Sequence, residues 1–156
     1  MNILALIPAR MGSSRFPGKP MAEILGKPMI GHVYDRVVEC DLLTKTVVAT
    51  CDKEIEDYIK SIGGEVIMTG NHHERASDRC AEALILLEEQ DGIEYDIIAM
   101  VQGDEPMTQP DMIAAAVRPM LEDPDILVVN LFGDIESVKE FEDRNCIKVI
   151  CDQNSD

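Results

Sequence analysis

Apolar residues recur along this chain in two patterns, and the patterns alternate. Short apolar runs that end at polar or glycine-containing segments predict strands buried on both faces. The predicted strands cover 3–8, 46–50, 65–69, 96–102, 126–131 and 146–151. Apolar residues three and four positions apart predict helices. The predicted helices cover 28–39, 53–62, 77–90 and 110–121.

The ends of the predicted helices carry recognisable signals. Asp52 and Ser77 are expected N-caps, Pro110 stands at a helix start, and Gly63 follows a helix end. Regular alternation of strands and helices predicts an α/β fold: a doubly wound, mostly parallel, Rossmann-like sheet with helices on both faces. With 156 residues, 46% of them hydrophobic, we expect residues 1–156 to form a single domain.

Composition narrows the classes of protein to which the chain could belong. A formal net charge of −16 argues against an extended nucleic-acid-binding face. No apolar run approaches the roughly 18 residues of a membrane span, and Pro8 and Arg10 interrupt the N-terminal apolar stretch, unlike a signal peptide. The five cysteines form no Cys-x-x-Cys pair, so neither a disulfide framework nor a zinc site is indicated. We therefore predict a cytoplasmic protein without membrane or nucleic-acid partners.

Positive charge is concentrated after the first predicted strand. Residues 1–34 hold four of the fourteen basic residues and only one of the thirty acidic ones. Glycine N–H groups, serine hydroxyls and basic side chains in this loop can all bind phosphate oxygens. The candidates are Arg10, Gly12, Ser13, Ser14, Arg15, Gly18 and Lys19. The loop is not a Walker loop, because five residues separate its glycines and Pro20 replaces the Mg²⁺-binding hydroxyl residue. We predict a phosphate-binding loop, with a solvated basic loop as the alternative.

Ligands of doubly wound sheets bind beyond the carboxyl ends of the strands, which makes 8–20, 69–79 and 102–109 the candidate site. In the last of these, Asp104 or Glu105 could hold Mg²⁺, and Gly103 leaves room for a nucleotide against the backbone. An ordinary turn rich in Asp, Gly and Pro is the alternative.

The middle segment begins with two adjacent histidines, His72 and His73. Neighbours in sequence rarely converge on one ion, so we expect no histidine-based metal site there. The better candidates for contact with an anionic or polyhydroxyl ligand lie at the predicted helix N-terminus. They are Arg75, Ser77, Asp78 and Arg79.

Taken together, these motifs carry a resemblance to a known family. The two long runs are Ile7-Pro-Ala-Arg-Met-Gly-Ser-Ser-Arg-Phe-Pro-Gly-Lys-Pro20 and Val101-Gln-Gly-Asp-Glu-Pro106. Shorter matches lie at 26–30, 48–50, 63–66, 68–69 and 77–79. In this combination the chain resembles the N-terminal part of the 3-deoxy-manno-octulosonate (Kdo) cytidylyltransferase family. The resemblance implies Mg²⁺-dependent transfer of CMP from CTP to the anomeric hydroxyl of an acidic sugar, with release of pyrophosphate, for lipopolysaccharide synthesis.

Residue roles follow from the same resemblance. Arg10, Lys19 and Asp104 would be catalytic, and Asp104 would also bind the metal. The implied nucleotide-binding residues are Ala9, Arg10, Gly12, Ser13, Arg15, Lys19, Ser77, Asp78, Arg79, Gln102 and Gly103. The full-length family also implies a homodimer.

Two departures from the family pattern keep alternatives open. The family usually has Ser-Gly-Thr-Asp-Arg where this chain has Glu74-Arg-Ala-Ser-Asp-Arg79. The family's chain also continues well beyond a segment similar to 145–152 and includes a second Mg²⁺-binding aspartate there. One alternative is a related nucleotidyltransferase for another acidic sugar or a sugar phosphate. The other is a truncated, non-catalytic nucleotide-binding module.

Overall fold

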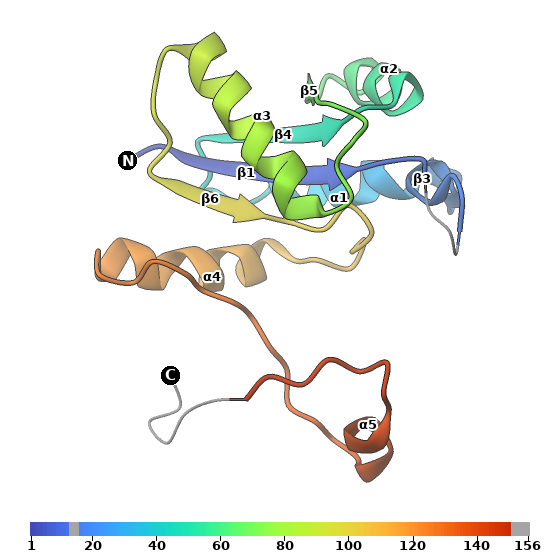
Figure 1. Ribbon diagram of the computed structural model, residues 1–156, viewed down its shortest axis with the longest axis vertical. Helices are drawn as coiled ribbons and strands as arrows, with labels where there is room; N and C mark the ends of the chain where they lie inside the picture. Colours follow the sequence, from blue (N-terminus) through green and yellow to red (C-terminus); the bar gives the residue numbers. More distant parts are fainter. Residues whose placement is uncertain (13–15, 151–156) are drawn as a thin grey trace.

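A four-stranded parallel sheet forms the centre of the molecule (Figure 1). The computed structural model describes residues 1–12 and 16–150. The strands are β1 (Ile3–Ala9), β4 (Lys45–Thr50), β5 (Glu65–Met68) and β6 (Ile97–Met100), in the order β5-β4-β1-β6. Leu6 of β1 lies between Val47 of β4 and Met100 of β6 in register. The predicted strands in the first two thirds of the chain and the predicted fold class are confirmed.

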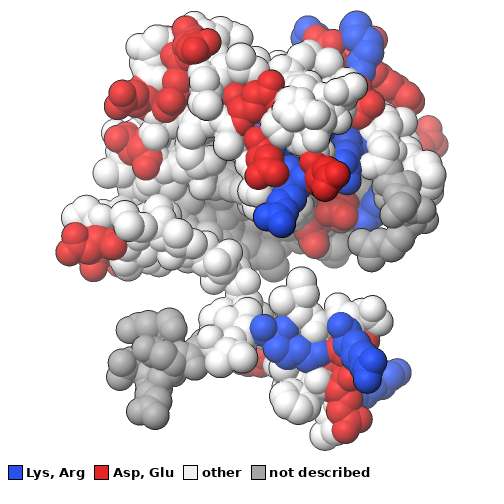
Figure 2. All heavy atoms as spheres, viewed as in Figure 1, with Lys and Arg blue, Asp and Glu red and all other residues white. Residues whose placement is uncertain are grey.

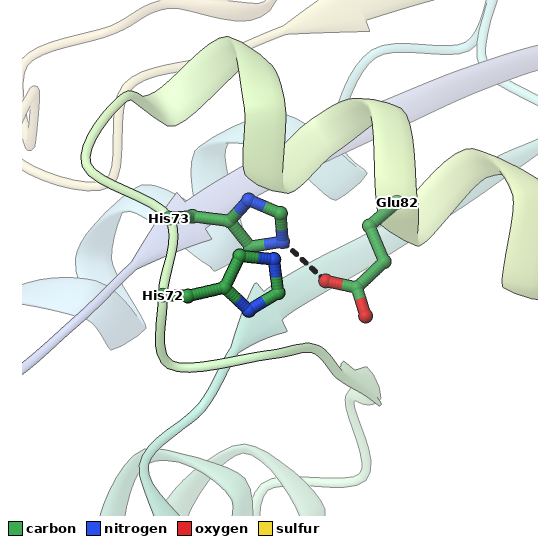
Figure 3. A group of neighbouring side chains, drawn as sticks. All are labelled: His72, His73 and Glu82. Carbon is green, nitrogen blue, oxygen red and sulfur yellow. Dashed lines mark hydrogen bonds and ion pairs between the residues drawn. The ribbon is translucent and has the colours of Figure 1, made fainter.

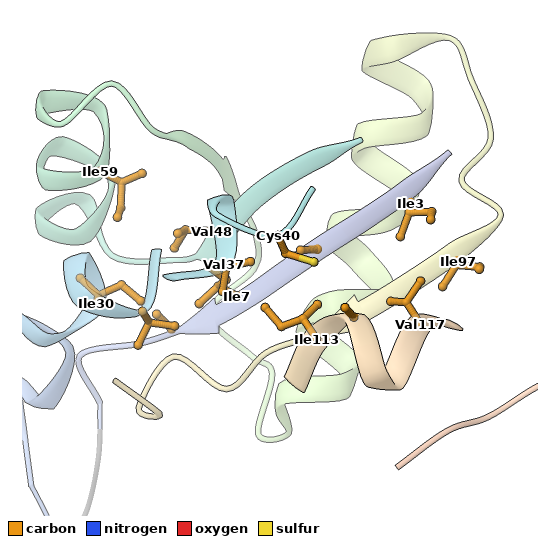
Figure 4. Packing of buried hydrophobic residues seen from close by; sticks show 14 of the residues in the cluster. Ile3, Ile7, Ile30, Val37, Cys40, Val48, Ile59, Ile97, Ile113 and Val117 are labelled. Atoms are coloured by element: carbon orange, nitrogen blue, oxygen red, sulfur yellow. The ribbon is translucent and has the colours of Figure 1, made fainter. Parts of the chain in front are cut away.

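Alternate residues of β1 face two separate hydrophobic clusters, because successive side chains of a strand point to opposite faces. Ile3, Ala5 and Ile7 belong to a large cluster, part of which Figure 4 shows. This cluster also contains residues of three helices: α1 (Met29–Val38), α2 (Lys53–Ser61) and α4 (Pro110–Glu122). Leu4 and Leu6 pack on the other face against α3 (Ala76–Asp91). Helices therefore cover both faces, as predicted.

Four short elements were not predicted. They are η1 (Lys19–Met21), β2 (Glu23–Ile24), β3 (Lys27–Pro28) and α5 (Val138–Glu142). Gly18 precedes η1 with φ of 74°, a left-handed conformation that glycine adopts without strain. Its N–H donates to the Met11 carbonyl at 2.9 Å, which closes the loop after β1. No helix in the described part of the chain is long and apolar enough to cross a membrane.

The predicted helix caps need correction. Asp52 does precede α2, but its side chain does not cap that helix. Its Oδ2 instead accepts the backbone N–H of Met11 at 2.8 Å, which ties the loop after β1 to the end of β4. Ser77 is the second residue of α3, whose N-cap position is occupied by Arg75 without a side-chain cap. The Asp52 side chain therefore bonds a residue distant in sequence and does not cap α2. Helix α3 begins one residue earlier than predicted.

The predicted strands 126–131 and 146–151 are wrong over the described residues, which show no regular strand after β6. Strands need hydrogen-bonding partners, and none of the described strands pairs with the outer edge of β6. The chain runs away from the sheet after α4 (Figure 1). Leu127 and Ile147 are 80% and 92% exposed, so their apolar character alone does not impose a strand. Cys151 lies outside the described residues.

Candidate functional site

A pocket of about 330 Å³ lies at the carboxyl ends of β1 and β6, beside the N-terminus of α3. All three candidate segments, 8–20, 69–79 and 102–109, contribute to its lining. Nine of the residues expected at the site line it. They are Ala9, Arg10, Gly12, Lys19, Arg75, Arg79, Gln102, Gly103 and Asp104.

Lys19 and Asp104 form an ion pair across the pocket. The Lys19 Nζ donates to Asp104 Oδ2 at 2.7 Å. The pair joins the segment after β1 to the segment after β6, 85 residues apart in sequence. Both side chains stay partly open to solvent, at 38% and 49% exposure. An ammonium group and a carboxylate thus stand side by side where a ligand can reach both.

Arg79 brings a buried positive charge to the same pocket. It is 2% exposed, and its guanidinium donates to Thr69 Oγ1 at 2.5 Å and to the Gly70 carbonyl at 3.3 Å. Its second terminal nitrogen lies 3.5 Å from Cys51 Sγ. These partners are uncharged, and no carboxylate pairs with Arg79 in the described part of the chain. A buried cation without a counter-ion is costly, so a bound anion would stabilise this arrangement.

Arg10, the residue after β1, contacts the loop that precedes α3. Its Nη1 donates to the backbone carbonyl of His73 at 3.1 Å. The next residues along that loop, Glu74 and Arg75, also line the pocket, together with Ala76 at the start of the helix. Helix N-termini present unpaired N–H groups and a partial positive charge. The pocket therefore combines four basic residues, Arg75 among them, with a helix N-terminus, a setting suited to phosphate groups.

Gly103 is required by the fold itself. A Cβ atom at this position would lie 2.6 Å from the backbone carbonyl oxygen of Pro8 in β1. It would also lie 3.3 Å from the side chain of Ile30. The expectation that Gly103 leaves room for a ligand stays a prediction, but close packing against β1 already explains the glycine.

Several expected residues do not join this group. Ser77 and Asp78 are exposed in the first turn of α3 and do not line the pocket. Ser13 and Arg15 lie outside the described residues. Sequence reasoning placed His73 and Glu74 inside the candidate segment 69–79 but gave neither a role in binding, although both line the pocket. Their position in the polar loop directly before α3 was the available signal.

Two residues that line the pocket, Asp104 and Glu74, have carboxylate side chains that could supply oxygen ligands for a metal ion. A second group lies beside it: His72, His73 and Glu82 have ligand atoms within 4.8 Å of one another (Figure 3). Glu82 Oε2, however, already accepts hydrogen bonds from the His73 ring and from the Gly70 N–H. Protein groups thus satisfy this carboxylate oxygen without an ion.

The chain is also similar in sequence to known proteins. The cytidylyltransferase family model matches residues 4–156. A 3-deoxy-manno-octulosonate cytidylyltransferase of Trichlorobacter lovleyi is 44% identical over 99% of this chain, and one of Syntrophotalea carbinolica is 45% identical over 98%. In both cases this chain spans 59% of the relative's length.

Solved structures show the same relationship. A CMP:2-keto-3-deoxy-manno-octonic acid synthetase complexed with CTP superposes with a TM-score of 0.71 and 41% identity. The superposition covers 81% of this chain and 50% of that one. A 4-diphosphocytidyl-2C-methyl-D-erythritol synthase, 17% identical over 76% of this chain and 54% of its own, has a TM-score of 0.61 and shares the fold.

Proposed function

The chain belongs to the cytidylyltransferase family, and on this premise we propose that it serves in transferring CMP from CTP to Kdo with release of pyrophosphate. The two relatives described above are named as Kdo cytidylyltransferases, and a structural neighbour at 41% identity was solved with CTP. Because the chain spans 59% of the length of such relatives, the proposal assigns to it the nucleotide-binding part of the reaction.

One observation carries this proposal: Arg10, Lys19 and Arg79 meet Asp104 in one pocket beside the N-terminus of α3. Arg75 lines the same pocket. The protein as a whole has a formal net charge of −16, so four basic residues in one pocket need a ligand-based explanation. A nucleoside triphosphate supplies several phosphate oxygens at once, and each can accept a charge-assisted hydrogen bond.

The reaction needs no covalent intermediate on the protein. The anomeric hydroxyl oxygen of the sugar would attack the α-phosphorus of CTP and lose its proton to solvent. The bond from that phosphorus to the bridging oxygen would break, and pyrophosphate would leave with the electron pair. Negative charge grows on the leaving oxygens, where Lys19 and Arg10 would neutralise it. Arg79 would hold the nucleotide from the buried side of the pocket.

Asp104 fits a role in holding Mg²⁺, because its carboxylate is 49% exposed in the pocket and hard cations prefer oxygen ligands. When bound, the ion would add positive charge at the phosphate oxygens. Asp104 would then exchange its contact with Lys19 for the metal, which would release the Lys19 ammonium group for a phosphate oxygen.

Pyrophosphate release with CTP, Mg²⁺ and Kdo tests the proposal. The assay runs beside neuraminic acid and other acidic sugars, so that it identifies the acceptor. Release that depends on Kdo is the expected result. Release with another sugar would favour a related nucleotidyltransferase. CTP binding without release for any acceptor would favour the non-catalytic module.

Three further expectations stay predictions. We propose that residues 1–156 act as one nucleotide-binding domain, that the protein works in the cytoplasm, and that the full-length form is a homodimer. Sedimentation of the purified protein over a range of concentrations tests the last of these.

A further inference from the structure

Glu82 lies outside the pocket, yet it is tied to the loop that forms one of the pocket walls. It is the seventh residue of α3, and its side chain is 32% exposed. Its Oε2 accepts the Gly70 N–H at 2.9 Å and also the ring Nε2–H of His73, as Figure 3 shows for the histidine. One carboxylate oxygen thus holds both ends of a four-residue stretch of the loop.

These two hydrogen bonds determine where the His73 and Glu82 side chains carry their protons. A carboxylate has no proton to donate, so His73 must carry its proton on Nε2 for the contact to form. The His73 ring and the Gly70 N–H together hold the pKa of Glu82 below its ordinary value. Glu82 is therefore ionised at neutral pH, and the hydrogen bond to His73 is charge-assisted, which makes it stronger than a neutral one.

His73, held in this way, also restrains Arg10. The His73 side chain is only 10% exposed, and its backbone carbonyl accepts the Arg10 guanidinium at 3.1 Å. The anchored ring fixes the position of the residue, and the carbonyl fixes the arginine at the pocket. Arg79, one turn before Glu82 on α3, holds the Gly70 carbonyl and the Thr69 hydroxyl of the same loop.

We propose that Glu82 is a positioning residue for the triphosphate: through His73 it holds the backbone carbonyl that aims Arg10 into the pocket. The inference rests on the proposed function, since it takes the bound anion to be a nucleoside triphosphate. Glu82 touches no ligand in this arrangement. It lowers the cost of binding because the loop and Arg10 are already ordered when the nucleotide arrives.

A double-mutant cycle in the complete chain tests the inference, with affinities for CTP and for cytidine measured by calorimetry. We expect Glu82→Ala to weaken CTP binding by about tenfold, the scale of one charged hydrogen bond, and to leave cytidine binding unchanged because cytidine has no phosphate. In the Arg10→Ala background the same substitution should have almost no further effect, since the two residues act as one unit. Glu82→Gln should bind CTP with intermediate affinity.

Glu88→Ala is the matched control. Glu88 is on the same helix and its Oε1 also accepts a backbone N–H, that of Tyr95 at 3.0 Å, but it does not line the pocket. This variant should bind CTP as the parent does. If Glu82→Ala unfolds the chain, the cycle is run with Glu82→Gln, which keeps the side-chain size.

Three results would overturn the inference alone: parental CTP affinity in the Glu82 variants, an equal loss of cytidine affinity, or a full effect that persists without Arg10. Absence of CTP binding by the parent chain would overturn the proposed function as well, and this separates the two failures.

Discussion

Lys19 and Asp104 carry opposite charges in the pocket, and we expect Lys19 to meet a phosphate group of the nucleotide and Asp104 to meet Mg²⁺. Their 2.7 Å ion pair is partly exposed on both sides, and exposed pairs contribute only about 0–1 kcal/mol. Separation of the pair therefore costs little compared with the contacts that phosphate and Mg²⁺ would provide. The pair keeps both groups in place without blocking either.

Asp104→Asn tests the metal role directly. The amide keeps the size of the side chain but removes the charge, so the Mg²⁺ concentration needed for half-maximal CTP binding should rise by about tenfold or more. Titration of Mg²⁺ at fixed CTP measures the shift. Asp111→Asn, in the first turn of α4 and away from the pocket, should keep the parental curve. A parental curve for Asp104→Asn would refute the assignment.

Gly103→Ala tests the packing role of that glycine. The added methyl group would lie 2.6 Å from the Pro8 carbonyl oxygen, and the backbone of a central strand cannot move away at low cost. We expect a loss of about 1–3 kcal/mol in the free energy of unfolding, measured by urea denaturation. Gly133→Ala, where a Cβ meets nothing within 4 Å, should be neutral. Equal stability of the two variants would contradict this account.

Individual site residues could be predicted from the sequence where the signal is local. Arg10, Lys19 and Asp104 each follow a clear apolar strand, so their place at one sheet edge follows from the fold. Asp52 could not be assigned correctly, because the N–H it accepts belongs to Met11, 41 residues away. The role of Glu82 likewise depends on a loop path that no local pattern encodes.

At the scale of elements, two carboxylates fasten α3 to its neighbours. Glu82 binds the loop before the helix. Asp91, the last residue of α3, accepts from Lys45 of β4 at 2.7 Å and from the Tyr95 hydroxyl at 2.6 Å. Hydrogen bonds to the ionised carboxylate lower both pKa values. The bond from His73 is the main cause for Glu82, and the bond from Lys45 is the main cause for Asp91. Burial, followed by the contact with Asp91, raises the pKa of Tyr95 to about 12.

The sign of the pH effect follows from these shifts. Both carboxyl groups have lower pKa values folded than unfolded, so their stabilisation is complete above the ordinary values of 4.5 and 3.8. It is lost as the pH falls through the lowered folded values, because the unfolded chain then binds more protons. The urea concentration at the midpoint of unfolding should therefore decrease as the pH is lowered from about 5 to about 3. It should decrease less steeply in Glu82→Gln and Asp91→Asn. An identical slope in the parent and both variants would rule out these contacts as the source.

Elements could be predicted where a strand has at least one partner in the sheet. β1 and β4 are apolar runs inside the sheet, and both were expected within one residue of their observed ends. The run at 126–131 has the same apolar character, but within the described part of the chain it pairs with no strand. Hydrophobic pattern specifies a strand only together with its neighbours, which is why the expectation failed there.

At the scale of the whole molecule, acidic residues outnumber basic ones by thirty to fourteen, whereas the pocket lining holds four basic residues and two acidic ones. On the face seen in Figure 2, acidic side chains stand alone toward the left of the sheet-containing part. Basic side chains stand among them toward the right, the side to which β1 points in Figure 1. The overall charge of −16 repels anions at long range, so a triphosphate must be held by the short-range contacts of Arg10, Lys19 and Arg79.

Calorimetric titration with CTP, CDP, CMP and cytidine, on the parent chain and on Lys19→Ala, tests most directly whether the pocket is a triphosphate site. We predict that affinity falls in that order for the parent as phosphates are removed. Lys19→Ala should lower CTP affinity by about tenfold or more without a lower melting temperature, because the side chain is 38% exposed. Equal affinities for CTP and cytidine, or parental CTP affinity in Lys19→Ala, would contradict the account.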